Sequence, residues 1–238
     1  MKIVKSIDEL RSYLKEAKNE GKTIGLVPTM GYLHEGHASL IKSARKDNDI
    51  VVVSIFVNPT QFGENEDLDS YPRDLEADSK ICEKIGADFI FAPEASEMYK
   101  NAKTFVDIED LSNNLCGTKR PGHFRGVCTV CTKLFNITGA DRAYFGQKDA
   151  QQVAIIKKVV KDLNIPIEII PCPIVREEDG LAMSSRNAYL TDEQRIAARC
   201  LSRAIFKGEE LAKNGASVKE VLSTMEEIIS SEKHAKID

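Results

Sequence analysis

The 238-residue sequence contains no tryptophan, few aromatic residues and no excess of positive charge. It has 33 lysine and arginine residues against 37 aspartate and glutamate residues, which gives a formal net charge of −4. Proteins that bind nucleic acid need a basic surface for the phosphate backbone. The composition therefore predicts no nucleic-acid partner, and a small anion would have to bind in a local basic pocket.

Long apolar runs are also missing. No run approaches the roughly 20 residues that cross a bilayer, and residues 1–6 lack the apolar core of a signal peptide. Six cysteines in a chain of this length do not make a disulfide scaffold. There is no internal repeat and no low-complexity segment. These absences predict a globular cytoplasmic protein with reduced cysteines and no membrane partner.

Two of the cysteines, Cys128 and Cys131, form a C-x-x-C motif within residues 124–137. Apolar residues around them repeat at helical spacing, so both are expected to be small core residues of a helix. A zinc site that also used Cys116 or His123 and a redox pair remain as alternatives. No second C-x-x-C is present to complete a tetrahedral set.

Apolar runs typical of strands alternate with amphipathic segments typical of helices up to about residue 176. The predicted strands cover residues 23–27, 50–57, 88–92, 142–145 and 167–170, and the predicted helices cover residues 38–45, 75–85, 124–137 and 150–163. This alternation favours an α/β fold, a Rossmann-like doubly wound parallel sheet with its ligand crevice at the carboxyl ends of the strands. Beyond it, only helices are expected, at 192–211 and 218–230. We therefore expect a nucleotide-binding domain over residues 1–175 and a smaller C-terminal domain over residues 176–238.

Two histidines, His34 and His37, and two glycines, Gly31 and Gly36, lie where the first predicted strand gives way to a helix. The first amides of a helix have no internal partner and the helix dipole adds about half a positive charge, so an anion is favoured there. Glycine lets the backbone approach a ligand closely, and the imidazoles can add two donors. The pattern indicates a phosphate site, although a helix cap with solvated imidazoles would have the same sequence.

Three further polar clusters follow predicted strands or lie in loops, at residues 56–63, 144–152 and 180–187. In the second, Lys148 can meet a phosphate and Asp149 a ribose hydroxyl; the third carries two serines and an arginine that suit phosphate oxygens. Each cluster could instead be a turn, an exposed helix start or an ordinary helix cap. Because the carboxyl ends of parallel strands meet in one crevice, the clusters together favour a common nucleotide site.

The turn at 30–37 and the later Met183-Ser184-Ser185-Arg186 together resemble the paired phosphate-binding signatures of nucleotidyl-transferring enzymes, which include class I aminoacyl-tRNA synthetases. A closer resemblance, to the pantoate–β-alanine ligase family, is carried by residues 56–62, 69–73, 120–127 and 145–152. It runs in unbroken order from the N-terminus to about Thr191. The sequence is thus identified as a member of that family.

This resemblance implies an ATP-dependent ligase that forms a C–N bond in pantothenate and coenzyme A biosynthesis. The pantoate carboxylate would attack the α-phosphorus of ATP to give pantoyl adenylate and pyrophosphate, and the β-alanine amine would then displace AMP. The implied partners are the small molecules pantoate, β-alanine and ATP, with Mg²⁺ on the phosphate oxygens. The family also suggests a cytoplasmic homodimer.

The resemblance assigns roles to individual residues. Catalysis is expected from His37, as proton donor, with His34, Lys148 and Arg186. ATP would be bound by Met30, Gly31, His34, His37, Gly146, Gln147, Lys148, Asp149, Val175, Met183, Ser184, Ser185 and Arg186. Pantoate would be held by Gln61 and Gln152. Asp78 is the candidate magnesium ligand, and Arg120 and His123 are further candidates in a loop that contains proline and glycine.

The family continues with strand-forming sequence beyond the helix predicted to end near Ser230, whereas this sequence stops at Asp238. We therefore expect the C-terminal domain, which would close over the crevice as a lid, to be incomplete, and we expect ATP binding with poor turnover. Two alternatives are another adenylyltransferase of the same superfamily and a non-catalytic nucleotide-binding module. Neither needs Gln61 and Gln152, so the presence of both favours the ligase.

Overall fold

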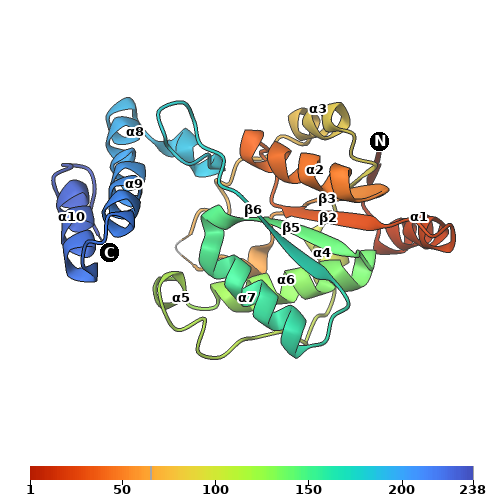
Figure 1. The fold of residues 1–238 in the computed structure, drawn as a ribbon. Helices are drawn as coiled ribbons and strands as arrows, with labels where there is room; N and C mark the ends of the chain where they lie inside the picture. The colour runs from red at the N-terminus through yellow and green to blue at the C-terminus, as the bar shows by residue number, and fades with distance from the viewer. Residues whose placement is uncertain (65, 238) are drawn as a thin grey trace. The chain divides into compact units, whose positions relative to one another are not determined.

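A parallel sheet flanked by helices confirms the α/β fold expected from the sequence. The chain is described by a computed structural model over residues 1–64 and 66–237. It divides into two compact units, Met1–Pro173 and Ile174–Asp238, the second of which runs from teal to dark blue in Figure 1. None of the helices in the described part of the chain has both the length and the apolar character of a membrane span.

The sheet of the first unit has six strands in the order β1-β4-β3-β2-β5-β6 within the described residues, and every neighbouring pair is parallel. The strands are β1 Lys2–Val4, β2 Ile24–Thr29, β3 Ile50–Ile55, β4 Phe89–Phe91, β5 Arg142–Gly146 and β6 Glu168–Cys172. Strands β3 and β4 lie on one side of β2 in the order in which they follow it in the sequence. The later strands β5 and β6 lie on the other side of β2. The order therefore reverses between β2 and β5, and in doubly wound folds ligands bind at such a reversal.

The two strands at the reversal separate toward their carboxyl ends. β2 pairs with β3 as far as Thr29, but its register with β5 ends at Leu26 opposite Ala143. The Thr29 carbonyl accepts from the Phe56 amide on the β3 side, so the preceding residue, Pro28, faces the β5 side. Because no β5 residue pairs with Pro28, the missing N–H of this proline costs no ladder bond.

Helices cover both faces of the sheet (Figure 1). One face carries α1 Ile7–Asn19, α6 His123–Thr138 and α7 Ala150–Asp162, and the other carries α2 Glu35–Asp47 and α3 Leu75–Ile85. On the first face Leu26 of β2 shares a buried apolar cluster with residues of all three helices, and on the second face Val53 of β3 packs with Ile41 and Cys82. The sheet is therefore buried on both sides, as its continuous apolar strands predicted.

The C-x-x-C cysteines belong to the first of these clusters, which confirms the apolar-core interpretation. Cys128 and Cys131 are buried in α6, and both thiols are free. Burial raises the pKa of Cys128 to about 12, which keeps its thiol protonated. Among the residues that the structure describes, no three His, Cys, Asp or Glu side chains are grouped to hold a metal ion.

Several element boundaries differ from the sequence-based expectation. β6 continues through Pro171, which is allowed because β6 is an edge strand. The helix expected at 192–211 is divided at Arg199 into α8 Asp192–Ala198 and α9 Cys200–Lys213. Strand β1 and helix α1 were not predicted from the sequence, although Ser6 caps α1 by accepting from the Glu9 amide. The short helices α4 Ala95–Tyr99 and α5 Cys116–Lys119 were not predicted either.

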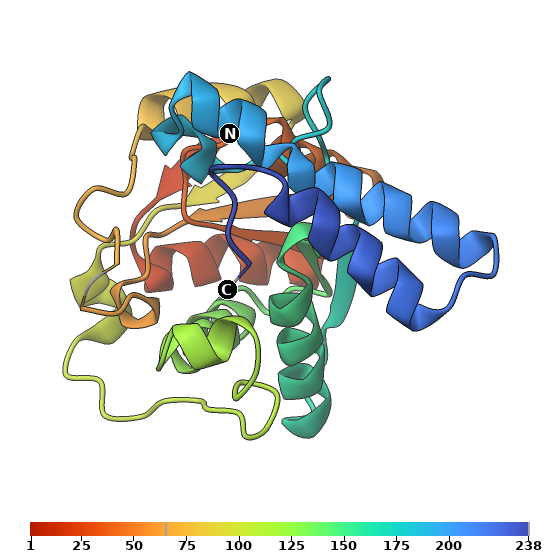
Figure 2. The ribbon, with the colours of Figure 1, turned by 90° about the vertical axis from the view of Figure 1, so that its left-hand side faces the viewer.

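The second unit contains helices and one short antiparallel bridge among its described residues, Arg176 with Ala182. After this bridge come the 3₁₀ helix η3 Ser185–Tyr189, α8, α9 and α10 Val218–Ser230. Figure 2 shows α9 and α10 side by side. Gly208 of α9 permits this packing, because an added Cβ would lie 2.5 Å from the Met225 sulfur on α10.

Candidate active site

The polar clusters of the first unit lie at one edge of the sheet, because each follows the carboxyl end of a parallel strand. The turn that follows β2 leads into α2, the 3₁₀ helix η1 Pro59–Gln61 follows β3, and the 3₁₀ helix η2 Gln147–Asp149 follows β5 and leads into α7. These are the strands on both sides of the reversal in strand order. The fold thus brings three of the four predicted clusters to the crevice where a ligand is expected.

The turn between β2 and α2 is held by a carboxylate from another helix. Gly31 and Tyr32 both have positive φ, of 85° and 52°. The amides of Tyr32 and Leu33 donate to the two oxygens of Asp78 on α3, at 2.9 and 2.6 Å. An added Cβ on Gly31 would lie 3.0 Å from an Asp78 oxygen, so glycine is needed for the conformation and for the space.

The structure does not support the assignment of Asp78 as a magnesium ligand. The side chain is buried, and both of its oxygens already accept backbone N–H groups. Burial raises the pKa of Asp78, while the two amides act in the opposite direction. Asp78 therefore shapes the turn between β2 and α2 instead of offering a free carboxylate to a cation.

The two histidines cap the helix that follows the turn. His34 Nδ1 accepts from the Gly36 amide at 3.1 Å, and His37 Nδ1 accepts from the His34 amide at 3.3 Å. The ring centroids are 4.1 Å apart. A ring nitrogen that accepts carries no proton, so in the neutral form the proton of each ring is on Nε2. The cap and the phosphate site, treated as alternatives in the sequence analysis, are therefore compatible, because the cap uses only Nδ1.

His37 is neutral at physiological pH. Its pKa is lowered to about 3, first by burial and then by the positive charges of His34 and Lys148. In this state the ring can donate a hydrogen bond from Nε2 but carries no positive charge of its own. A bound triphosphate would favour the charged form again.

The segment after β5 is open and polar. Gln147, Lys148 and Asp149 are exposed, and Lys148 Nζ lies 3.4 and 3.5 Å from the Asp149 carboxylate oxygens. Gly146 has φ of −75°, which any residue adopts, and an added Cβ would meet no atom within 4 Å. The fold does not require glycine at this strand end, and its missing side chain leaves room for a ligand.

Gln61 is buried next to the turn between β2 and α2. Its Nε2 lies 3.1 Å from the sulfur of Met30, which places the predicted pantoate residue against a predicted ATP residue. Gln152 lies half-buried in the first turn of α7. The neighbouring Gln151 has a different task, since its amide donates to the carbonyls of Leu111 and Asn114 and so fixes the loop before α5.

Arg120 and His123 are linked to Gln61 through a chain of contacts. Arg120 makes a two-pronged ion pair with Glu66, with both N···O distances 2.6 Å, and lies 3.1 Å from His123 Nε2. His123 Nδ1 is 2.9 Å from the Gln61 carbonyl. Because an arginine can only donate, His123 Nε2 accepts and Nδ1 donates to Gln61. Arg120 lowers the pKa of Glu66, and the pair supports the segment that carries Gln61.

The remaining predicted residues form a group within the second unit. The Val175 carbonyl accepts from the Met183 amide at 3.0 Å, which closes a hairpin around Gly180 with φ of 90°. Ser184 caps η3 by accepting from the Arg186 amide at 3.3 Å, Ser185 is buried, and Arg186 is exposed. The helix-cap interpretation of Ser184 is thus correct.

Arg195 of α8 fixes this hairpin and was not found from the sequence. It donates to both oxygens of Glu177, at 3.2 and 2.6 Å, and to Asp179 at 3.0 Å. Asn187 adds bonds to Glu177 and to the Ala182 carbonyl. The loop that carries Met183 to Arg186 is therefore built on a charged network within its own unit.

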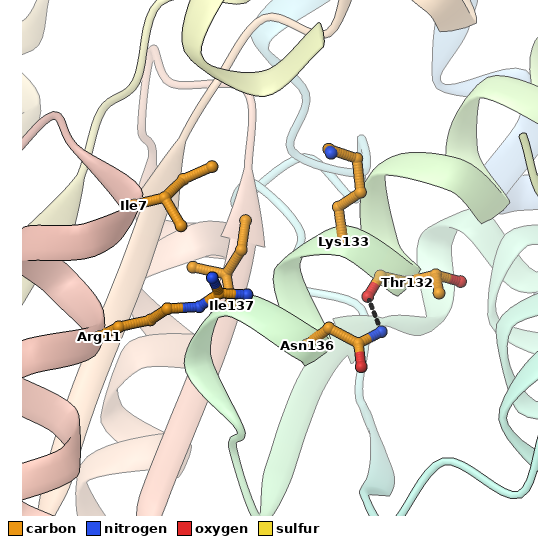
Figure 3. A pocket seen from close by; sticks show the side chains of 6 residues that line it. All are labelled: Ile7, Arg11, Thr132, Lys133, Asn136 and Ile137. Atoms are coloured by element: carbon orange, nitrogen blue, oxygen red, sulfur yellow. Dashed lines mark hydrogen bonds between the residues drawn. The ribbon is translucent and has the colours of Figure 1, made fainter. Parts of the chain in front are cut away.

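A groove of about 300 Å³ lies elsewhere in the first unit, between α1 and α6 (Figure 3). It is lined by Ile7, Arg11, Thr132, Lys133, Asn136 and Ile137. Figure 3 shows the Asn136 amide turned back onto the Thr132 carbonyl of its own helix, at 2.8 Å. None of these six residues belongs to the predicted site.

The parallel sheet is doubly wound, and two histidines lie at the start of the helix that follows its central strand β2. These features define an α/β protein of the nucleotidylyl-transferase type. The family model described as pantoate–β-alanine ligase matches residues 2–238. The chain belongs to the pantoate–β-alanine ligase family, whose members are ligases that form a C–N bond.

Relatives and solved structures agree with this assignment. The chain is 58% identical to a pantothenate synthetase of Acetivibrio thermocellus and 60% identical to one of Clostridium acetobutylicum, in each case over all of this chain and 85% of the relative. The crystal structure of pantothenate synthetase from Thermus thermophilus superposes with a TM-score of 0.93 at 46% identity, over 97% of this chain and 83% of that one. The crystal structure of a pantoate–β-alanine ligase from Francisella tularensis, complexed with β,γ-ATP and β-alanine, superposes with a TM-score of 0.84 at 37% identity. The match covers 96% of this chain and 86% of that one.

Proposed function

We propose that this chain condenses pantoate with β-alanine at the expense of ATP, through a pantoyl-adenylate intermediate. The observation that carries the proposal is the contact between Gln61 and Met30, which joins a buried carboxamide to the phosphate turn. An enzyme that adenylates a small hydroxy acid needs both groups in one crevice. The family membership and the ATP and β-alanine in the Francisella complex support the same reaction.

In the first step a pantoate carboxylate oxygen attacks the α-phosphorus of ATP and the bond to pyrophosphate breaks. The chain's part is to align the two reactants and to offset charge on the transferring phosphoryl group. His37 would donate from Nε2, His34 would lie beside it, and Lys148 would supply the fixed positive charge. Gly146, Gln147 and Asp149 would receive the ribose side of the nucleotide, and Gln61 and Gln152 would hold pantoate.

In the second step the β-alanine amine attacks the acyl carbon of the adenylate, the bond to AMP breaks, and the amine loses a proton. No covalent bond to the protein is needed. Water must be kept away from the adenylate while the amine binds. We propose that the second unit provides this protection as a lid, and that Val175, Met183, Ser184, Ser185 and Arg186 bind ATP from it.

Magnesium is proposed as part of the substrate, bound to the phosphate oxygens of ATP. Among the described residues no acidic or histidine cluster is arranged as a metal site, and the Asp78 oxygens accept backbone amides. Mg²⁺ commonly keeps several waters and binds mainly through substrate phosphates, which fits this set of donors.

We also propose that the protein acts as a homodimer in the cytoplasm. Support for the dimer is the family resemblance, and support for the compartment is that all six cysteines are unpaired. Sedimentation at micromolar concentration tests the dimer, since a single species of 26.4 kDa would contradict it.

The reaction is tested by following pyrophosphate and AMP separately. The chain is mixed with ATP, Mg²⁺ and pantoate, and β-alanine is added later. Pyrophosphate that depends on pantoate, followed by AMP and amide only after β-alanine, supports the two-step ligase. Pyrophosphate release without pantoate would favour another adenylyltransferase, and nucleotide binding with no release would favour a non-catalytic module.

A further inference from the structure

The orientation of the buried Asn58 side chain is set by the backbone. Its Oδ1 accepts from the Thr60 amide at 3.4 Å, and its Nδ2 donates to the Gly126 carbonyl at 3.2 Å. A backbone N–H can only donate and a carbonyl can only accept, so the two ends of the Asn58 amide cannot be exchanged. Asn58 is 1% exposed, and water therefore does not compete for these bonds.

The fixed Asn58 determines the orientation of Gln61. Asn58 Nδ2 also donates to Gln61 Oε1 at 3.1 Å, which leaves Gln61 Nε2 on the opposite side, 3.1 Å from the Met30 sulfur. A thioether is a weak acceptor, so the Nε2 protons remain available to a better one. Gln61 therefore offers donors, and the group that it holds must be an oxygen with lone pairs, such as a carboxylate or hydroxyl.

Tyr99 contacts Asn58 on the side away from Gln61, so the three side chains form a row of hydrogen bonds. Its hydroxyl donates to Asn58 Oδ1 at 2.8 Å, which is shorter than the bond from the Thr60 amide, and Thr60 Oγ1 donates to the same atom at 2.9 Å. The ring is held between Phe56, with centroids 6.2 Å apart, and the Lys133 ammonium, 5.7 Å above the centroid. Packing thus places the hydroxyl, which also lies 3.3 Å from Thr60 Oγ1, and because Asn58 Oδ1 can only accept, the bond between Tyr99 and Asn58 is donated by Tyr99.

The hydrogen bonds run in one direction, from the Tyr99 O–H to Asn58 and from the Asn58 N–H to Gln61. Donation to the oxygen of an amide polarises that amide and makes its N–H groups stronger donors, so the effect accumulates along the chain. We infer that Tyr99 is a positioning residue for pantoate, whose hydroxyl acts through Asn58 to orient the Gln61 amide and strengthen its donors. This inference rests on the proposed function of the site.

The test removes one oxygen atom. Tyr99→Phe keeps the ring, and we expect KM for pantoate to rise about 3- to 10-fold, as for loss of one neutral hydrogen bond. KM for ATP and for β-alanine and kcat should change by less than about 2-fold. Tyr144→Phe is the matched control, because Tyr144 is a buried tyrosine whose hydroxyl bonds Asn48 and Asp47 instead. Equal effects of Tyr99→Phe on all three KM values would overturn the inference.

A second variant separates positioning from general support. In a Gln61→Ala background Tyr99 has no amide left to orient, so adding Tyr99→Phe should change KM for pantoate by less than about 2-fold. If Tyr99→Phe raises KM for pantoate as much in that background as in the wild type, the relay of hydrogen bonds from Tyr99 through Asn58 to Gln61 is contradicted. Gln61→Glu should weaken pantoate binding more than Gln61→Ala, because it keeps an acceptor for Asn58 and replaces the outward donor by an oxygen.

A readout independent of turnover distinguishes failure of the relay from failure of the proposed function. The side-chain amide resonances of Asn58 and Gln61 should shift in Tyr99→Phe and stay in place in Tyr144→Phe. If the wild-type chain releases no pantoate-dependent pyrophosphate, the proposed function is wrong. If the wild type is active and the two amides do not shift, the relay is wrong.

Discussion

The carboxylate of Asp78 accepts a hydrogen bond of 2.6 Å from the backbone amide of Leu33, 45 residues earlier in the chain. Together with the bond to the Tyr32 amide, it closes the turn that presents both histidines. Asp78→Asn would turn an NH₂ group toward one of these amides and leave a buried donor without a partner. We expect the free energy of unfolding to fall by about 1–3 kcal/mol and KM for ATP to rise.

Asp74→Ala is the matched control for Asp78→Asn. Asp74 caps the same helix by accepting from the Ala77 amide at 2.9 Å, and it has no bond to the turn. Loss of such a cap costs about 1 kcal/mol. Urea unfolding and ATP titrations on both variants should show lost stability in each but weakened ATP binding only in Asp78→Asn. Weakened ATP binding in both would mean that α3 as a whole supports the turn.

The neutral state of His37 makes part of the stability depend on pH. Its folded pKa, about 3, is below the unfolded value of 6.5, so between these limits the unfolded chain binds one more proton than the folded chain. Above pH 6.5 the neutral state of His37 does not reduce the free energy of unfolding, which then falls as the pH drops from 6.5 toward 3. Between pH 7 and pH 5 the free energy of unfolding should fall by about 1–2 kcal/mol more in the wild type than in His37→Gln.

Urea unfolding at the two pH values measures this difference. His234→Gln, which removes a histidine from the second unit, is the control variant. A gap between the wild type and His37→Gln that is constant with pH would show that His37 titrates normally in the folded protein.

Gly126 allows α6 to approach the segment that carries Gln61. An added Cβ would lie 2.3 Å from the Thr60 carbonyl oxygen and 2.6 Å from the Gln61 Cα, and both are backbone atoms that cannot turn aside. Gly126→Ala should lower the free energy of unfolding by about 1–3 kcal/mol and raise KM for pantoate. Thermal unfolding and steady-state kinetics check both effects, and normal pantoate binding would show that η1 moves without disturbing Gln61.

Gly146 should behave in the opposite way. Its φ is ordinary and a Cβ there meets no protein atom within 4 Å, so Gly146→Ala should leave Tm unchanged or raise it slightly. If the open space holds nucleotide, the same methyl group should weaken ATP binding at least several-fold in a calorimetric titration. Unchanged affinity would place the nucleotide away from this strand end.

The regular parts of the fold could be predicted because they depend on local pattern. The apolar run before Asn58 predicts β3, and α3 and α10 begin and end where their amphipathic patterns do. The turn between β2 and α2 could also be predicted, because its histidines and glycines lie close together in the sequence where a strand pattern gives way to a helix pattern. Strand ends at prolines were misplaced, since a proline breaks a strand only where its N–H would face a partner, and that depends on sheet order.

The supporting contacts could not be predicted. Asp78 reaches the turn across 45 residues, Tyr99 reaches Asn58 across 41, and Arg120 reaches Glu66 across 54. Asp78 and Arg120 were named from the sequence, but for contacts with ligands instead of the turn and Glu66. Nothing in the neighbouring sequence marks Tyr99, since a tyrosine after a methionine is unremarkable by itself. The sequence predicts which side chains would touch substrate, and the three-dimensional contacts show what holds those side chains in place.

Pro28 affects how much free energy would be needed to separate β2 from β5 when a substrate binds. A residue with an N–H at this position could extend the ladder between β2 and β5 whenever the crevice is empty, and a ligand would then have to break those bonds to enter. Proline cannot supply that bond, and β2 and β5 do not pair beyond Leu26. If the substrates bind between these strand ends, as proposed, no binding energy is needed to separate the two strands, and all of it is available to hold the substrates.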